Sequence, residues 1–275
     1  MVGSIRRAAL AAGIVASMSA SAFAFDKPPT APVRPVTDRY FGTDVVDNYR
    51  YMENLKDPDV QAWMKAQANF TRRQLDALPG RKALLQRVHA WLNTDVYRGS
   101  FVRRGQRYFY EEFQPDVPLP KLYYRDGLKG PGHLLIDPVA LGKGTATHVA
   151  LDYFVPSWDG KFLAYGLSEG GSEKGKLHVL KVDGARVLSE AIDRTDEDQV
   201  AWRPDNASFF YLRYAKPAAD TPRSQTMYNA RAYLHVVGAN ANGDGDAVVF
   251  GRGVSPRLDV PEGGNYALDI PNFNP

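Results

Sequence analysis

A short motif, in which a turn is followed at once by an aromatic β-strand, recurs along this chain and constrains its fold more than any other feature. Three clear copies begin at Gly105, Asp159 and Asp205, and a fainter copy begins at Gly263. Successive copies lie about 50 residues apart, which suits one four-stranded propeller blade per repeat. One small sheet cannot bury both of its faces alone, so successive sheets must stack. The repeat predicts a mainly β fold, an incomplete β-propeller of about four blades; a single antiparallel sandwich is the alternative.

A short α-helical segment is predicted before these repeats. Asp57 is a suitable N-cap and Pro58 occupies the first helical position. Apolar residues recur at helical spacing in two stretches of residues 57–92, and Pro79-Gly80 separates the two helices. We therefore expect an extended arm and helical segment over residues 25–80 and a partial propeller domain over residues 81–275.

From residue 100 onward the apolar period changes from helical spacing to alternation, which is typical of strands. Turn signals such as Asp126-Gly127 and Asp183-Gly184 separate the alternating segments. The expected strands are residues 100–113 as a hairpin turning at Arg104-Gly105, then 121–125, 162–167, 176–182, 209–214 and 232–237.

The first residues have the pattern of a bacterial secretory signal. Arg6 and Arg7 precede an uncharged run over residues 8–21, and Ala22-Phe23-Ala24 supplies a cleavage site. The run is shorter than the roughly 20 residues that span a bilayer, although a short membrane anchor stays an alternative. We expect residues 1–24 to be a signal peptide cleaved after Ala24, and the mature chain to be secreted or periplasmic, without a membrane partner.

Composition excludes several classes of protein. The chain of 275 residues carries 34 Lys and Arg against 31 Asp and Glu, a net charge of +3 that argues against a nucleic-acid partner. Hydrophobic residues make up 44% and charged residues 24%, which excludes a disordered chain. The absence of cysteine excludes disulfides and thiolate chemistry.

One segment matches the nucleophile-elbow pattern G-x-S-x-G of serine hydrolases. It is Gly166-Leu167-Ser168-Glu169-Gly170. The elbow requires a strand before the serine and a helix after it, so that the hydroxyl is exposed beside an oxyanion hole. Here a second strand, residues 176–182, is expected instead of a helix. We therefore predict a hairpin and no catalytic role for Ser168.

Other motifs are weaker. Residues 170–176 nearly match a P-loop, but Leu177 stands where a Ser or Thr must bind magnesium. Residues 240–245 resemble the start of a calcium loop, but Gly251 replaces the bidentate Glu, so we expect an exposed turn. The acidic segment 193–198 is expected to be a solvated loop. The five histidines show no i+3 or i+4 pairing that would indicate zinc, and the residues indicate no catalytic, cofactor or metal site.

The order of these segments resembles the N-terminal part of the prolyl oligopeptidase family of serine peptidases. Asp47-Asn48-Tyr49-Arg50-Tyr51-Met52-Glu53 is similar to the segment with which that family begins, D-P-Y-R-W-L-E-D. The strongest likeness is residues 156–166 followed by Gly170-Gly171-Ser172-Glu173. Further similar segments are Ala62-Trp63, Gln67-Ala68-Asn69, Tyr108-Phe109-Tyr110, Leu135-Ile136-Asp137-Pro138, Val200-Ala201-Trp202 and Phe209-Phe210-Tyr211. The likeness covers nearly all of residues 37–240.

The resemblance implies a function for the chain. Family members place a seven-bladed propeller over an α/β-hydrolase domain, and the propeller admits only short or unfolded peptides to a Ser-Asp-His triad that cleaves after proline. The family's triad lies in the C-terminal portion, past Pro275, so no catalytic residue is carried over and this chain alone is expected to be inactive. The implied partners are short peptides and the C-terminal α/β-hydrolase domain. The alternative is a stand-alone, non-catalytic propeller module that binds a peptide or protein.

The chain also departs from the family pattern. Asn48 replaces a proline, and Lys174 replaces an aromatic residue. A substrate-contacting arginine of relatives would fall near Pro271, and no arginine is present there. Because the family's helical segment packs against the catalytic domain, we expect Trp63, Met64 and Phe70 to form a poorly covered apolar face. A propeller of about four blades is also expected to leave unpaired strand edges.

Overall fold

The computed structural model of the chain describes residues 27–92, 94–145, 147–172, 175–219, 221–222, 225–258 and 260–261. The chain divides into two compact units, residues 1–89 and 90–275. This division falls near the end of the second helix, whereas the sequence-based boundary preceded that helix.

The first unit opens with a β-hairpin. Strand β1 (Val36–Tyr40) pairs with β2 (Thr43–Asp47), and the turn residues Phe41 and Gly42 both have positive φ, +50° and +86°. Two positive φ values match the right-handed twist of a hairpin. The sequence had indicated only the turn at Gly42. A 3₁₀ helix, η1 (Arg50–Glu53), follows, and Arg50 Nε donates to Asp47 Oδ2 at 3.0 Å.

Two helices complete this unit. Helix α1 (Pro58–Asp76) begins as predicted, because the Asp57 side chain accepts a hydrogen bond from Asp59 N at 2.8 Å. The proline-rich arm covers part of α1, since the Trp63 indole donates to the Pro29 carbonyl oxygen at 3.2 Å. Helix α2 (Arg81–Leu92) is described in full, and none of its residues is buried.

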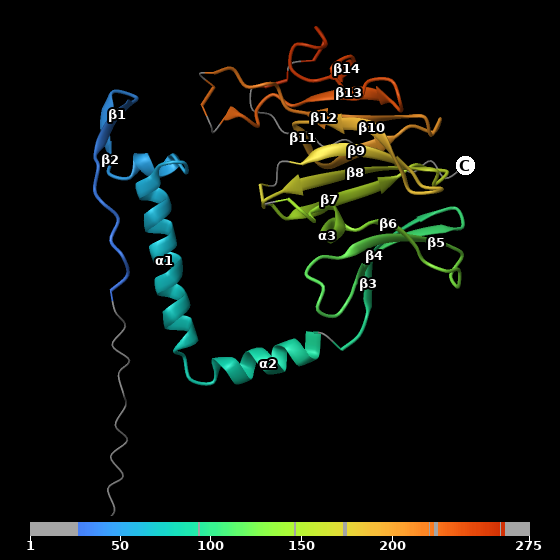
Figure 1. Ribbon diagram of the computed structural model, residues 1–275. Coiled ribbons are helices and arrows are strands. Elements are labelled where there is room, and N and C mark those ends of the chain that lie inside the picture. The colour runs from blue at the N-terminus through green and yellow to red at the C-terminus, as the bar shows by residue number, and fades with distance from the viewer. Residues whose placement is uncertain are drawn as a thin grey trace, which may run out of the picture. The chain divides into compact units, whose positions relative to one another are not determined.

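The described residues of the second unit form three four-stranded antiparallel sheets, each an up-and-down meander (Figure 1). The first comprises β3 (Tyr97–Arg104), β4 (Arg107–Phe113), β5 (Lys121–Asp126) and β6 (His133–Ile136). Helix α3 (Pro138–Leu141) leads to β7 (Val149–Pro156), β8 (Phe162–Glu169), β9 (Lys176–Lys181) and β10 (Arg186–Ile192). The third comprises β11 (Thr195–Trp202), β12 (Ser208–Arg213), β13 (Arg231–Val236) and β14 (Ala247–Phe250).

The repeated motif is the first hairpin of each sheet. Its turns contain Gly105, Gly160 and Asn206, all with positive φ between +56° and +67°. Glycine and asparagine tolerate this region best, which explains why they mark the repeat. The structure thus describes three of the expected blades, and the fainter copy at residues 263–268 lies outside the described residues. Three successive sheets confirm the partial propeller over the single sandwich.

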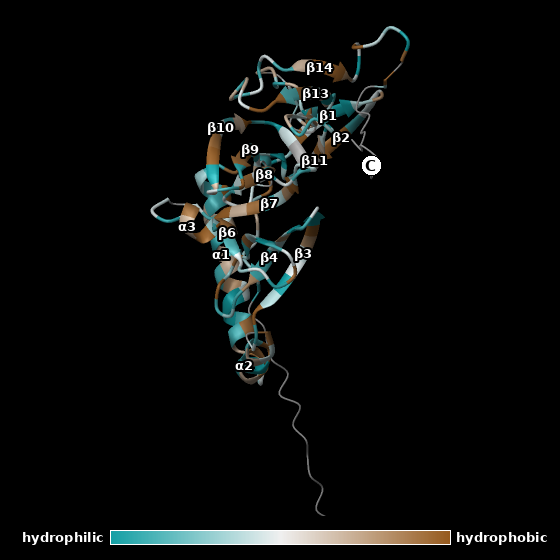
Figure 2. Cartoon of the chain, turned by 90° about the vertical axis from the view of Figure 1, so that its right-hand side faces the viewer, coloured by the Kyte–Doolittle hydropathy of each residue, from teal (hydrophilic) through white to brown (hydrophobic). Residues whose placement is uncertain are grey.

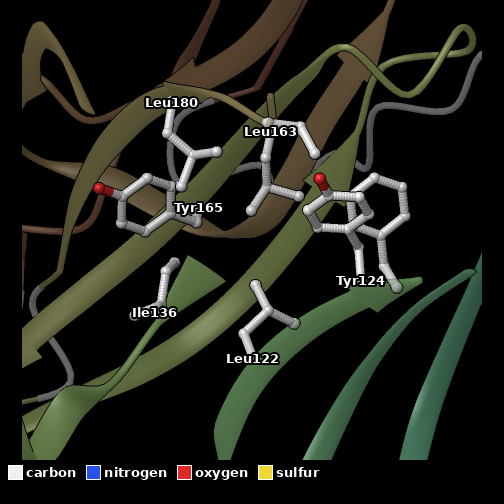
Figure 3. Packing of buried hydrophobic residues seen from close by; sticks show 8 residues of the cluster. Leu122, Tyr124, Ile136, Leu163, Tyr165 and Leu180 are labelled. Carbon is white, nitrogen blue, oxygen red and sulfur yellow. The ribbon is translucent and has the colours of Figure 1, made fainter. Parts of the chain in front are cut away.

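Two apolar layers join the three sheets. Phe109, Leu122 and Tyr124 of the first sheet pack against Leu163, Tyr165 and Leu180 of the second, and Figure 3 shows this layer. The next residue along β8, Ala164, belongs to the other layer, which meets Trp202 and Phe209 of the third sheet. Because successive strand residues point to opposite faces, the middle sheet is apolar on both sides. Apolar segments accordingly recur along its strands (Figure 2).

The structure corrects several expectations. Strands β6, β7, β10, β11 and β14 were not predicted, and β11 starts within the acidic segment expected to be a loop. Trp63 and Phe70 are half-buried, and of the three residues expected to form an apolar face only Met64 is exposed, at 49%. The more exposed apolar residues lie on α2, where the exposure of Trp91 is 66% and that of Leu92 is 76%.

Candidate functional site

Ser168 lies inside strand β8 rather than at a nucleophile elbow. Its side chain is buried and its hydroxyl donates to Asp152 Oδ1 at 2.6 Å. The chain after it passes through a turn at Gly170-Gly171 to strand β9, as predicted. Gly166, the first glycine of the pattern, serves packing: a Cβ there would lie 2.3 Å from Tyr153 Cε1. The motif is therefore part of a packed sheet.

The segments resembling a P-loop and a calcium loop have structural roles. Lys176 begins β9, so a strand stands where a P-loop requires a helix. In the turn at residues 240–245, the Asp244 carboxylate accepts from Arg213 Nη1 at 3.0 Å and from Asn242 Nδ2 at 2.9 Å. Within the part of the chain that the structure describes, no group of three His, Asp or Glu residues could hold a metal ion.

A buried polar cluster, here called the polar clasp, joins the second and third sheets. It consists of Glu190, Tyr211, His235 and Asp246. The His235 Nδ1 atom lies 2.8 Å from Asp246 Oδ2, which also accepts from the Tyr211 hydroxyl at 2.9 Å. On its other side, His235 Nε2 lies 3.6 Å from Glu190 Oε1, and that oxygen accepts from Gly238 N at 2.6 Å. The imidazole thus bridges two carboxylates with no exposure to solvent.

The clasp alters the acidity of its members. Burial alone would lower the pKa of His235, but its contacts with Glu190 and Asp246 outweigh burial and hold the pKa above its usual value. Burial acts to raise the pKa of Glu190, but its contacts with His235 and Gly238 N prevail and lower it. Burial and the Asp246 charge raise the pKa of Tyr211. The arrangement therefore favours the protonated form of the His235 imidazole relative to a free histidine.

A second feature, here called the basic cavity, is lined by residues of the third sheet and of the loops next to it. Its volume is about 610 Å³. The lining residues are Arg194, Arg213, Ala215, Lys216, Asn229, Arg231, Tyr233, Arg252 and Gly253. Five of these are cationic and none is acidic, so the cavity favours anions.

Other histidine and arginine side chains have local partners. His178 Nδ1 lies 2.9 Å from the Glu190 carbonyl oxygen, within the second sheet. Arg104 of the Arg103-Arg104 pair donates from Nε to the Pro156 carbonyl oxygen at 3.2 Å and its guanidinium lies over Trp158, which joins the first two sheets. Arg72 forms an ion pair with Asp76 at 3.5 Å along α1.

Sequence reasoning found neither the clasp nor the basic cavity. Glu190 lies far from His235 and Asp246 in the sequence, the spacing of the three matches no motif, and the arginines of the cavity are likewise spread along the chain. The one available signal was a histidine, His235, within the strand expected over residues 232–237. It is packed and fully buried.

Among the residues that the structure describes, no helix combines the length and the apolar character that a membrane crossing requires.

Comparison with known proteins agrees with this architecture. Residues 28–258 match the family described as the prolyl oligopeptidase N-terminal beta-propeller domain. The prolyl endopeptidase of Elizabethkingia meningoseptica is 28% identical over 234 residues, covering 85% of this chain and 32% of that protein. Prolyl oligopeptidase A of Galerina marginata is 28% identical over 256 residues, covering 82% of this chain and 34% of that protein.

Solved structures show the same relation. A structure from a study of two prolyl endopeptidases and their inter-domain dynamics is 28% identical, with a TM-score of 0.69 over 82% of this chain and 33% of that one. Prolyl oligopeptidase B from Galerina marginata, bound to a 25mer macrocyclization substrate, is 20% identical and shares the fold with a TM-score of 0.66, covering 82% of this chain and 34% of that one.

The chain spans about a third of the length of the curated relatives it matches. The family match runs from the proline-rich arm through helices α1 and α2 to residue 258, which follows β14. The chain belongs to the prolyl oligopeptidase family, as its N-terminal β-propeller domain.

Proposed function

We propose that this chain is the propeller portion of a secreted prolyl oligopeptidase-like serine endopeptidase, and that it gates the access of short proline-containing peptides to a catalytic α/β-hydrolase domain. The observation that carries the proposal is the family match over residues 28–258, together with the three stacked four-stranded sheets. The pattern of residues 1–24 supports export.

The links between the sheets suit a gate. Trp158 Nε1 donates to the Trp202 carbonyl oxygen at 2.8 Å, and Trp202 Nε1 donates to the Val155 carbonyl oxygen at 2.9 Å. These reciprocal hydrogen bonds join the second sheet to the third, in addition to the polar clasp. Since the blades are fixed to one another, the propeller would admit a flexible peptide and exclude a folded protein.

The test uses the native protein, captured from its source with an antibody raised against residues 97–258. We expect the captured material to cleave a proline-containing chromogenic peptide, and a fluorophosphonate probe to label a serine outside residues 1–275. The recombinant 275-residue chain alone is expected to give no turnover, because Ser168, the serine of the elbow-like motif, is buried in a strand and donates to Asp152.

Two further arms complete the test. The same proline sequence placed in a loop of a folded protein should resist the captured enzyme, whereas the free peptide is cleaved. Captured material that neither labels nor cleaves would favour the stand-alone binding module. Turnover by the recombinant chain that disappears in Ser168→Ala would contradict our interpretation of the β8 serine.

A further inference from the structure

The cations of the basic cavity occupy corresponding ends of neighbouring strands. Arg194 lies just before β11, Arg213 ends β12 and Arg231 begins β13. Arg213 and Arg231 are direct cross-strand partners in the register of the sheet. Like charges directly opposite each other destabilise a pair of strands, so their juxtaposition requires compensation from an anion.

The anions within the chain compensate part of this charge. Asp193 pairs with Arg213 and with Arg194 Nη2, the latter at 3.2 Å, and Asp244 pairs with Arg213 at 3.0 Å. Neither aspartate lines the cavity. Among the described residues, the lining cations Lys216 and Arg231 form no ion pair with either aspartate, so positive charge exceeds negative charge at the cavity.

Arg231 is one of the lining cations that Asp193 and Asp244 do not contact. Its Nη2 donates to the Arg252 carbonyl oxygen at 3.2 Å, which is a neutral partner. The residue is exposed, although the aliphatic part of its side chain lies close to the backbone at Gly251. Gly251 has a φ of +137°, and a Cβ there would lie 2.7 Å from Arg231 Cγ, so a glycine is required for the arginine to occupy this position.

Arg213 gives the cavity a fixed wall. Its side chain is only 6% exposed, and Nε donates to the Asp193 carbonyl oxygen at 3.1 Å. Arg194 Nη1 donates to the Tyr214 carbonyl oxygen at 2.9 Å, while its Nε atom is buried without a hydrogen-bond partner. Two guanidinium groups are therefore oriented by the protein before any ligand arrives.

We propose that the basic cavity binds the carboxylate groups of an acidic peptide. Guanidinium groups pair with carboxylates through two parallel hydrogen bonds, and Arg213 already binds carboxylates of the chain. The volume of about 610 Å³ exceeds the needs of a single bare anion and lies within the range of about 300–1,000 Å³ typical of ligand pockets. The choice of a peptide rests on the proposed function, while the preference for carboxylates follows from the cavity itself.

The experiment is calorimetric titration of the full 275-residue chain with a short peptide of three consecutive glutamates, blocked at both ends. The matched probe replaces each glutamate with glutamine. We expect the glutamate peptide to bind at least about tenfold more tightly, and its affinity to fall as salt rises from about 50 to 200 mM, because the attraction is electrostatic. Arg231→Gln should weaken binding by about tenfold.

Arg186→Gln is the matched control, since Arg186 is an exposed arginine at the start of β10 outside the cavity. It should leave the affinity within about twofold, and both variants should unfold at the wild-type temperature. Equal binding of the two peptides, or equal weakening by the two variants, would overturn the proposal. Displacement of the peptide by inorganic phosphate at a lower concentration than acetate would reassign the cavity to phosphate and overturn the choice of carboxylate.

This titration and the test of the proposed function can fail independently of each other. The titration measures binding by the chain without turnover, so it remains decisive if the native protein lacks peptidase activity. Conversely, the captured enzyme could react with the probe and cleave the peptide while the 275-residue chain binds both glutamate and glutamine peptides alike. That result would support the proposed function and overturn only the proposal of an acidic ligand.

Discussion

At the scale of single residues, Gly166 shows how a sequence motif can arise from packing. The ring of Tyr153 on β7 occupies the space that a Cβ at Gly166 would need, with Cε1 at 2.3 Å and Cδ1 at 2.7 Å. Both residues are cross-strand partners in the sheet. The glycine is therefore required for the ring to lie against β8, and the resemblance to a catalytic elbow is incidental.

Gly166→Ala should destabilise the protein by about 1–3 kcal/mol, because overpacking forces side chains or backbone to move. The measurement is urea unfolding followed by tryptophan fluorescence. Gly142→Ala is the control: its φ is −77° and its nearest neighbouring atoms lie at 3.5 Å, so alanine fits there. We expect Gly142→Ala to be neutral or slightly stabilising, by up to about 1 kcal/mol. Equal effects of the two substitutions would contradict the role assigned to Tyr153.

Glu190, on β10, is the member of the polar clasp that belongs to the second sheet. Glu190→Gln preserves the shape and an acceptor for Gly238 N but removes the charge facing His235. We expect a loss of about 1–3 kcal/mol, since a hydrogen bond or pair involving a charged group is worth that much when buried. Urea unfolding measures it.

Glu169→Gln provides the comparison for that loss, because Glu169 is exposed at the end of β8. Its substitution should change the free energy of unfolding by no more than about 0.5 kcal/mol. If Glu190→Gln is equally mild, the clasp contributes nothing measurable to the stability of the two sheets.

At the scale of helices and strands, the sequence was informative where one chemical signal decided the local structure. Asp57-Pro58 located the start of α1, and the aromatic strands β4, β8 and β12 were predicted from alternation beside a turn. Each of those strands is an inner strand of its sheet and has buried residues at adjacent positions, which point to opposite faces. Their patterns are strong because both faces are buried.

The strands that were missed lie at the edges of the sheets or carry mixed residues. Strands β6, β10 and β14 are outer strands with many exposed side chains. Strand β11 begins in an acidic segment, and charged residues of this kind are typical of a solvated loop. The clasp was unpredictable for a different reason. Its members come from β10, β12, β13 and the turn before β14, and only the stacking of sheets brings them together.

Helix α2 is the element whose apolar side chains are least covered. Leu84, Leu85, Trp91 and Leu92 are each at least 48% exposed. A contiguous apolar face of this kind binds hydrophobic dyes. Trp91→Gln combined with Leu92→Gln should therefore reduce the dye fluorescence of the 275-residue chain by about half or more. Leu128→Gln, which removes an equally exposed leucine from a turn of the first sheet, should leave it unchanged. A signal that both variants leave unchanged would place dye binding elsewhere, for example at open strand edges.

At the scale of the whole molecule, the sheets of the second unit should unfold together, because polar as well as apolar contacts cross between them. The Asp159 amide donates to Asn206 Oδ1 at 2.9 Å, and the Ala191 amide donates to the Ala241 carbonyl oxygen at 2.7 Å. With the tryptophan pair and the clasp, these bonds join the second and third sheets at several places. A change in the protonation of His235 should therefore be visible in the stability of the whole unit.

The pH dependence of that stability has a definite sign. Because the folded pKa of His235 lies above its unfolded value of about 6.5, the folded protein binds the proton more tightly. The resulting stability is fully present below pH of about 6.5 and is lost as pH rises through the folded pKa. His178 affects stability in a different pH range, because burial lowers its pKa. The folded protein therefore binds this proton less tightly than the unfolded chain, and His178 lowers the stability as pH falls below about 6.5. Urea unfolding at a series of pH values measures both effects.

His235→Gln isolates the contribution of the clasp in this series, since the difference in free energy of unfolding between wild type and variant cancels the groups that they share. That difference should be greatest at about pH 6 and should shrink steadily toward pH 9, because only the wild-type imidazole gives up its proton between the two carboxylates. A difference that stays constant, or that grows with rising pH, would mean that His235 is neutral in the folded protein. The clasp would then join the sheets through ordinary hydrogen bonds rather than through charge.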